Sequence, residues 1–403
     1  MVSLKDMKMG IACILLMTYL VLVKSGEDGD TSLSRKQEEE LKLLKKPAMK
    51  SIKTKYGDIY DCVDIKKQPA FDHPLLRNHS IQMKPSSFPK GMIDKELLAS
   101  KPSKIGVNSS WCPPGTVLIQ RIQKEDIIKS ESQVRRYHGH TGQLITENPG
   151  YHFATFRLIR SDRNYYGGSV HLSIDQPVLY SVNQFSEAVL WVENGPIDQL
   201  NSIQVGWTAN PKLFGDNRPR MFSYWTADGF HKTGCYNLLC PGFVQLSRKL
   251  SFGQTYDVIS TYGGDQYEDN FLVYKDPKSG NWWYFKDLDG GHEPVGYWPS
   301  SLFTTLRDSA STIASGGQVY SPTNERSPQM GNGHFPIQNQ RFSTAARRLQ
   351  FVNERNVMVD PDAGSLKIEM DSPACYTVES VVPRAKVWIN SIFYGGPGGA
   401  CGI

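Results

Sequence analysis

Apolar and polar residues alternate in short runs along the chain from about residue 150 onward. Residues 201–208 show the pattern most clearly, with the sequence NSIQVGWT. Every second position is apolar, and the positions between are small or polar, which predicts a β-strand with one face in a core. On the polar face Gln204 is the only long side chain. The sequence therefore raises the question of what a glutamine does at this position.

Similar runs recur at a spacing that suits short strands, and turn residues such as those at 276–281 separate them. The runs are 151–159, 167–175, 185–194, 202–210, 220–228, 242–247, 270–276, 281–286 and 294–299. Regular short strands predict a mainly β fold, an antiparallel sandwich or barrel, rather than alternating strands and helices. Residues 301–312 are the one fair candidate for a helix in this part. If residues 316–320 are extended, Gly316, Gln318 and Tyr320 share one face.

The part of the chain before residue 150 has a different pattern. Residues 31–46 (TSLSRKQEEELKLLKK) are typical of a helix, with Ser and Thr at the start and Lys at the end. Residues 115–130 predict a strand that leads into a short helix. The polar, dibasic stretch 130–142 is a candidate linker and proteolytic site. We therefore expect a mixed N-terminal segment, 26–145, and a β domain, 146–403.

Residues 1–25 indicate a secretory signal peptide. Basic residues precede a short apolar run that ends at Val23, and Lys24, Ser25 and Gly26 follow it. The run is shorter than the ~20 residues of a comfortable membrane span, although a signal anchor is the alternative. No later segment is apolar enough to cross a bilayer. We expect a protein that is soluble outside the cytosol once the signal is removed.

Cysteine usage agrees with that compartment. Without Cys13, six cysteines remain, and an even number in a secreted chain suggests disulfides. Their order along the chain favours three local pairs: Cys62–Cys112, Cys235–Cys240 and Cys375–Cys401. A zinc site at the middle pair would need two further soft ligands, and no matching pair is present. We expect no metal and no cofactor.

The charge distribution suggests that the two parts of the chain attract each other. Residues 26–145 carry 21 basic and 15 acidic side chains, a net charge of +6, whereas residues 146–403 carry 21 and 24, a net charge of −3. A solvated basic segment without a fixed partner is the simpler alternative. The total of +5 gives no reason to expect a nucleic-acid partner. Sequons at Asn78 and Asn108 predict glycosylation.

Few local motifs carry chemistry. No GxSxG elbow, HExxH helix or Walker loop occurs. Asp287 begins a calcium-like loop, but its twelfth position is Trp298, so we interpret it as a turn. His138 and His140 lie in the candidate linker, where a solvated pair is expected. The paired aromatics at 282–283 and 297–298 fit a core better than a sugar-binding surface.

Longer stretches resemble the neprosin family of secreted plant proteins. They are QVGWTANPKLFGDNRPRMFSYWTADGFHKTGCYNLLCPGFVQ (204–245), KDPKSGNWW (275–283), VGYWPSSLF (295–303) and GGQVYSP (316–322). In addition, DCVDIKKQPAFDHPLLRNHSIQMKPSSF (61–88) is similar to the family's activation peptide. The resemblance implies a signal peptide, an inhibitory pro-segment at 26–145 and a β-sandwich of two antiparallel sheets at 146–403.

The resemblance also implies a function, that of a glutamic peptidase which cleaves after proline in acid. In such an enzyme one ionised glutamate activates water while a protonated one serves the carbonyl or the leaving amine. The first family glutamate maps onto Gln204. The second maps onto Gln318, or onto Ala314 four residues earlier. Neither alternative leaves a carboxylate, and an amide cannot accept a proton in the working pH range.

Two functions from different classes follow. The first is a secreted peptidase acting through Gln204, Gln318 and a replacement acid, for which the candidates are Glu187, Glu193, Asp228 and Asp265. The second is a catalytically silent relative that binds extended proline-containing peptides or cell-wall polymers. For both we expect an extracellular location in the apoplast or cell wall, or the vacuole. We also expect the basic pro-segment to cover the binding face and to detach in acid.

Overall fold

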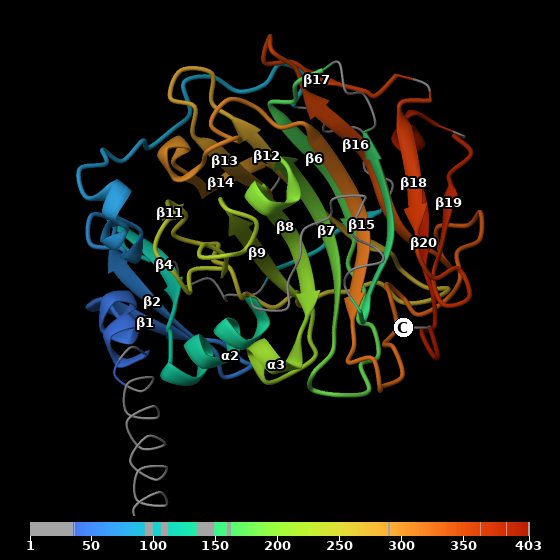
Figure 1. Ribbon diagram of the computed structural model, residues 1–403, viewed down its shortest axis with the longest axis horizontal. Coiled ribbons are helices and arrows are strands. Elements are labelled where there is room, and N and C mark those ends of the chain that lie inside the picture. Colours follow the sequence, from blue (N-terminus) through green and yellow to red (C-terminus); the bar gives the residue numbers. More distant parts are fainter. Residues whose placement is uncertain are drawn as a thin grey trace, which may run out of the picture.

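The computed structural model describes residues 35, 37–92, 100–105, 112–134, 149–158, 163–288, 291–362, 364–383 and 385–401. Within this part of the chain two large sheets pack face to face, and a smaller sheet lies at one side of them (Figure 1). The predicted antiparallel sandwich is confirmed, and so is the strand of residues 201–208. No helix among the described residues is long and apolar enough to cross a membrane.

The first large sheet has seven antiparallel strands. In spatial order they are β10 (Cys235–Tyr236), β9 (Arg220–Thr226), β8 (Asn201–Ala209), β7 (Phe185–Asn194), β15 (Thr312–Tyr320), β5 (Tyr151–Leu158) and β18 (Leu366–Met370). The central strands β8, β7 and β15 are long and buried on both faces. This sheet carries both glutamines that the sequence pointed to.

The second sheet packs against the inner face of the first. Its path is β11 (Val244–Gln245), β14 (Gly291–Trp298), β13 (Trp282–Leu288), β12 (Tyr267–Lys275), β6 (Gly167–Ser173), β16 (Thr344–Val352), β20 (Ile392–Gly395) and β19 (Thr377–Ser380). Two short strands join it from the side: β17 (Met358–Val359) and β3 (Lys101–Pro102). The expected core tryptophans Trp282, Trp283 and Trp298 are fully buried here, and Trp282 and Trp298 lie in the cluster between the sheets.

The N-terminal segment forms a third, three-stranded sheet of β1 (Ala48–Lys53), β2 (Ile59–Asp64) and β4 (Thr116–Gln120). The predicted strand and helix at 115–130 are confirmed as β4 and α2 (Lys124–Val134), and residues 37–44 of the predicted N-terminal helix are helical. In Figure 1 this segment lies beside the sandwich, and α2 lies next to α3 (Pro211–Phe214) at its lower edge. The remaining short helices are η1 (Pro69–Asp72), η2 (Pro74–Leu76), η3 (Ile197–Gln199), η4 (Ser300–Leu302) and η5 (Lys386–Trp388).

The expected helix at 301–312 is wrong. Only η4 forms there, and β15 begins at Thr312. The reason is a buried side chain, Asn201, whose Oδ1 accepts hydrogen bonds from the backbone N–H groups of residues 304, 305 and 306 at 2.8, 2.9 and 3.2 Å. Trp282 Nε1 donates to the Leu306 carbonyl at 2.8 Å. Side chains from distant strands thus satisfy the backbone groups that a helix would have paired.

All three expected disulfides are present: Cys62–Cys112, Cys235–Cys240 and Cys375–Cys401. The first joins Cys62 of β2 to Cys112, which precedes β4 in the chain. The second closes a tight turn after β10, and the third ties down the Gly-rich C-terminal tail. Each disulfide therefore lies within one region of the chain, as the order of the cysteines predicts.

Candidate functional site

The outer face of the seven-stranded sheet, the one turned away from the second sheet, carries the candidate residues. On β8, Ile203, Val205 and Trp207 belong to the core between the sheets. Strand geometry therefore places Gln204 on the outer face. The same alternation gives the outer face Trp191 of β7, Ala314 of β15 and Tyr224 of β9, which cluster together. In the full-length chain this face is buried, and Gln204 is 0% exposed.

One row across this face is centred on Trp191. Trp191 lies directly opposite Gln204 on one side and opposite Ala314 on the other. Residues that are paired in this way project side by side. Gln204 and Ala314 thus flank the indole of Trp191, two strand spacings or roughly 10 Å apart. We call Gln204, Trp191 and Ala314 the Trp191 row.

A hydrogen-bonded chain leads from this row to a carboxylate. The Gln204 side chain donates through Nε2 to Ser202 Oγ at 3.1 Å, and Ser202 Oγ donates to Glu193 Oε1 at 2.8 Å. Ser202 and Glu193 are cross-strand partners and both are buried. These contacts hold the Gln204 amide with its nitrogen toward Ser202. Glu193, one of the acids expected from the sequence, is therefore coupled to Gln204 through a single hydroxyl.

A second row lies four residues further along the strands. Glu187 of β7 is opposite Thr208 of β8 and opposite Gln318 of β15. We call Thr208, Glu187 and Gln318 the Glu187 row; at about 3.3 Å per residue it lies about 13 Å from the Trp191 row. The structure thus places Gln318 beside Glu187 and away from Gln204. Of the two alternatives for the second family position, Ala314 shares a row with Gln204.

The Glu187 carboxyl is held in its neutral form. Burial raises its pKa from 4.5 to about 8, and the nearby Thr208 hydroxyl lowers it only in part. Glu187 is 1% exposed, and neither of its carboxyl oxygens has a hydrogen-bond partner of good geometry among the described residues. The carboxyl is therefore protonated at acid and neutral pH. A protonated carboxyl can donate a hydrogen bond but cannot take a proton from water.

Glycine separates the two rows. Gly206 and Gly316 flank Val189 in the register between the rows. A Cβ on Gly206 would lie 1.9 Å from the Ala188 carbonyl oxygen, and one on Gly316 would lie 2.4 Å from the Ala154 carbonyl oxygen. Gly316 also has φ +142°, a conformation that other residues avoid. Between the rows the sheet therefore presents backbone on both sides of Val189.

Aromatic rings line one side of this face. Tyr224, which is opposite Gln204, packs edge-on against Tyr236 at 4.6 Å and stacks with Phe230 at 5.5 Å between ring centroids. Leu213 of α3 belongs to the same cluster. The Trp191 row thus adjoins apolar, aromatic surface, while the Glu187 row is polar.

The other expected acids have structural roles. Asp228 lies in a turn after β9, where burial raises its pKa but hydrogen bonds from Thr233, among others, prevail and lower it. Asp265 is exposed and pairs with Lys101 at 2.8 Å. Neither reaches the two rows by register. Of the four acids, the structure places Glu187 and Glu193 on the outer face.

Of the two predicted glycosylation sites, one lies among the described residues. Asn78 is exposed, as a glycosylated residue must be. Asn108, His138 and His140 lie outside the described residues, as do residues 1–25. Among the residues that the structure does describe, no group of three His, Cys, Asp or Glu side chains is arranged to hold a metal ion.

The N-terminal segment docks on the sandwich chiefly at the second sheet. Ala70 and residues near it pack on the outer face of that sheet, in the cluster that contains Trp283 and Tyr297. Asp276, at the end of β12, accepts hydrogen bonds from the Ser86 backbone N–H at 2.7 Å and from the Ser86 hydroxyl at 2.5 Å. The described part of the segment therefore covers the sheet opposite the two rows.

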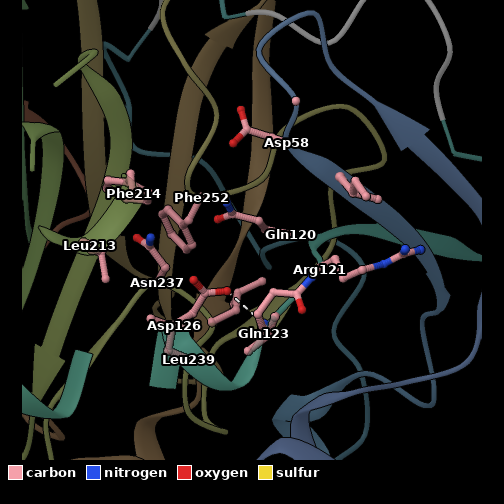
Figure 2. A pocket seen from close by; sticks show the side chains of 14 residues that line it. Asp58, Gln120, Arg121, Gln123, Asp126, Leu213, Phe214, Asn237, Leu239 and Phe252 are labelled. Carbon is pink, nitrogen blue, oxygen red and sulfur yellow. Dashed lines mark hydrogen bonds between the residues drawn. The ribbon is translucent and has the colours of Figure 1, made fainter. Parts of the chain in front are cut away.

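A second contact lies at the edge near α3. Asp58 of the N-terminal segment pairs with the buried Arg220 of β9 at 3.0 Å, and Arg220 also pairs with Asp216 at 2.8 Å. A cavity of about 210 Å³ lies beside these residues. Figure 2 shows Asp58 and Gln120 from the segment facing Leu213, Phe214, Asn237 and Phe252 of the sandwich across it. Of the charged residues in the described lining, Asp58 and Arg121 are ion-paired with Arg220 and Asp61, and Asp126 accepts a hydrogen bond from the Gln123 backbone N–H at 2.8 Å.

Comparison with known proteins gives two family matches between residues 51 and 397. The family model described as Neprosin matches residues 182–397, and the model described as Neprosin activation peptide matches residues 51–157. Similar solved structures include scytalido-glutamic peptidase with a peptide-based transition state analogue, at 11% identity and TM-score 0.33, covering 61% of this chain and 97% of that one. A second structure of that peptidase with a transition state analogue inhibitor has TM-score 0.29 at the same identity and coverage. A β-porphyranase from the human gut bacterium Bacteroides plebeius shares 8% identity, covers 41% of this chain and 55% of that one, and has TM-score 0.20.

Proposed function

The chain belongs to the neprosin family and carries the family's activation peptide, and from this premise we propose that its sandwich binds an extended polypeptide without hydrolysing it. The binding surface is the outer face of the seven-stranded sheet. The observation that supports this is the composition of the Trp191 row, where Gln204 and Ala314 flank the indole and no carboxyl group stands. We further propose that the protein leaves the cell as a precursor, with residues 1–25 as its signal.

Peptide hydrolysis needs a group that removes a proton from water. Gln204 lacks one, because a carboxamide has no basic site in the accessible pH range. Burial raises the pKa of Glu187 to about 8, so its carboxyl is protonated in acid and cannot act as the base there. Without a base beside Trp191, the row can hold and polarise a peptide carbonyl through the Gln204 amide but cannot activate the attacking water.

The chemistry of the face fits a polypeptide. Rings such as Trp191 and Tyr224 offer flat apolar surface of the kind that receives proline-rich segments in an extended conformation. The amide of Gln204 can form hydrogen bonds with main-chain groups of the bound peptide. We therefore propose proline-containing peptides as the ligand class, with extended cell-wall polymers as the alternative that the same surface would suit.

A second candidate function is supported by the hydrogen-bonded chain from Gln204 to Glu193. In that case Glu193 would take up the proton through Ser202 while Gln204 orients the water. Such a peptidase would depend on Ser202 and Glu193, and Glu187 could serve as the acid that protonates the leaving amine. The two functions make opposite predictions for catalysis.

A direct assay separates them. Full-length protein is held in acid until the pro-segment is released, and is then incubated with proline-containing decapeptides at pH 3 to 6. Binding followed by fluorescence anisotropy with no new termini in mass spectra is the result expected. Cleavage by the purified wild-type protein would overturn the binding function, and its loss in Glu193→Gln would assign the base to Glu193.

A further inference from the structure

The Glu187 row is a cluster of buried polar side chains without hydrogen-bond partners of good geometry among the described residues. Thr208 and Gln318 are 0% exposed and Glu187 is 1% exposed. Among the described residues, neither carboxyl oxygen of Glu187, neither polar atom of the Gln318 amide nor the Thr208 hydroxyl has a hydrogen-bond partner of good geometry. Three adjacent strands supply one side chain each, and all three point to the outer face. Such a cluster needs an explanation, because unpaired buried polar groups cost free energy.

The row does not serve the core of the sandwich. On the same strands the inward positions Ala188 and Val319 lie in the apolar cluster between the sheets, whereas Glu187 and Gln318 face outward. The Thr208 hydroxyl lies close enough to the Glu187 carboxyl to lower its pKa in part, but none of the three side chains has a hydrogen-bond partner of good geometry among the described residues. Their hydrogen-bonding capacity is thus available to something that lies on the face.

The row is also electrically neutral. Arg220, which continues the row on β9, is fully engaged by Asp58 and Asp216. Phe153 continues it on β5. Among the described residues, no free cation therefore faces Glu187 along the row. A neutral carboxyl, a carboxamide and a hydroxyl together offer both donors and acceptors but no charge to balance an ion.

We propose that Thr208, Glu187 and Gln318 form an amide-binding subsite, which accepts a neutral amide of the bound polypeptide and rejects a carboxylate. A carboxamide and a main-chain amide share the chemistry that fits, because each presents an N–H and a C=O to the protonated acid and the Gln318 amide. A carboxylate of the ligand would lose its hydration at this subsite without gaining a counter-charge. This subsite rests on the proposed binding function and would determine which peptides that function selects.

Spacing locates the recognised group on the ligand. Glu187 is four residues from Trp191 on one strand, and Val189 with Gly206 and Gly316 lies between. An extended chain that runs along the strands covers this distance with about four of its own residues. The recognised amide therefore lies about four positions from the residue that contacts Trp191.

The experiment uses acid-processed full-length protein and one frame of fluorescein-labelled, proline-containing decapeptides. In one series each position in turn carries Gln, Glu or Leu, and in the other each main-chain amide in turn is replaced by an ester. At pH 6 we expect one position at which Gln binds about tenfold more tightly than Glu, or one amide whose replacement weakens binding about fivefold. The first outcome assigns a side-chain carboxamide, and the second a main-chain amide.

Variants link that preference to the row. Glu187→Leu and Gln318→Leu should each abolish it, whereas Glu187→Gln, which keeps a neutral donor and acceptor, should retain it within about twofold. Glu354→Gln and Glu354→Leu, at an exposed site with a 66% accessible side chain, are the matched controls. Thermal unfolding of each variant reports on the fold.

The outcomes are distinguishable. If wild-type protein binds the peptides but the Leu variants keep the same preference, the subsite is overturned while the binding function stands. A stronger preference for Glu than for Gln at the mapped position would also overturn it. If wild-type protein binds no decapeptide at all, the proposed function fails, and the subsite fails with it.

Discussion

Replacing Glu187 by glutamine tests whether this carboxyl is neutral in the folded protein. The substitution keeps the size and the hydrogen-bonding groups of the protonated acid but removes its titration. In the folded chain burial raises the pKa of Glu187 from 4.5 to about 8. Between these values the folded state binds more protons at this position than the unfolded state. Stability therefore falls as the pH rises through this window.

The size of the effect follows from the same pKa values. Each pH unit well inside the window lowers the free energy of unfolding by about 1.4 kcal/mol. From pH 5 to pH 7.5 the contribution of Glu187 amounts to about 3 kcal/mol, which Glu187→Gln should not show. Asp175, whose pKa is raised by burial to about 6, acts in the same direction in both proteins and cancels in the comparison.

The assay is urea unfolding of the full-length wild type and variant at both pH values, with Glu354→Gln as the control for the same chemical change at an exposed site. Wild type and control should lose about 3 kcal/mol more than Glu187→Gln between pH 5 and pH 7.5. Parallel losses in all three proteins would refute the reasoning. Glu187 would then be ionised in the folded state, and the protonated acid would be unavailable to the proposed subsite.

Three further predictions concern other parts of the chain. The double variant Gln204→Glu with Ala314→Glu should create acid endopeptidase activity on proline-containing peptides. The double variant Gln204→Glu with Gln318→Glu should not, because only the first pair of positions flanks Trp191. Activity in the second double variant alone would contradict the assignment of the rows. Asp276→Asn should weaken docking of the pro-segment in protease-protection assays at pH 7. Burial raises the pKa of Asp276, but hydrogen bonds from Ser86 and others prevail and lower it to about 2. The contact between Asp276 and Ser86 therefore persists at pH 4 and is lost as the pH falls from 3.8 through about 2. If the wild-type pro-segment were released at pH 4 as fast as that of the variant, this role of Asp276 would be contradicted. Asn201→Ala should destabilise the chain by about 2–4 kcal/mol in urea unfolding, since three backbone N–H groups lose their acceptor; a change below about 1 kcal/mol would mean that water replaces it.

The strand pattern of the sandwich could be predicted because period-two alternation is a local property of the sequence. It identified β8 and the outward side of Gln204, and it places Glu187 and Trp191 on one face of residues 185–194. The order of the cysteines gave the disulfides for a similar reason, since each pair is close in sequence. Local signals thus account for the elements and for the face on which each candidate lies.

The rows could not be predicted, because they depend on which strands are neighbours and in what register. Gln204 and Gln318 look equivalent in sequence, as polar residues near glycine on extended segments. Only the pairing of β7 with both β8 and β15 shows that Trp191 belongs with Gln204, and that Gln318 belongs with Glu187. The helix expected at 301–312 failed for a related reason: Asn201, about a hundred residues away, supplies the acceptor that the local sequence lacks.

The shared core of the two parts of the chain has a consequence for the lifetime of the protein. Val63, Leu76, Val117 and Ile119 of the N-terminal segment belong to the same buried cluster as the residues between the two large sheets. If the segment is removed, as the proposed function requires, this cluster loses the contribution of these four side chains. We therefore expect the lifetime of the sandwich alone to be set by its unfolding rate. We also expect the precursor to refold from urea more readily than the processed protein, because only the precursor still has these core contacts.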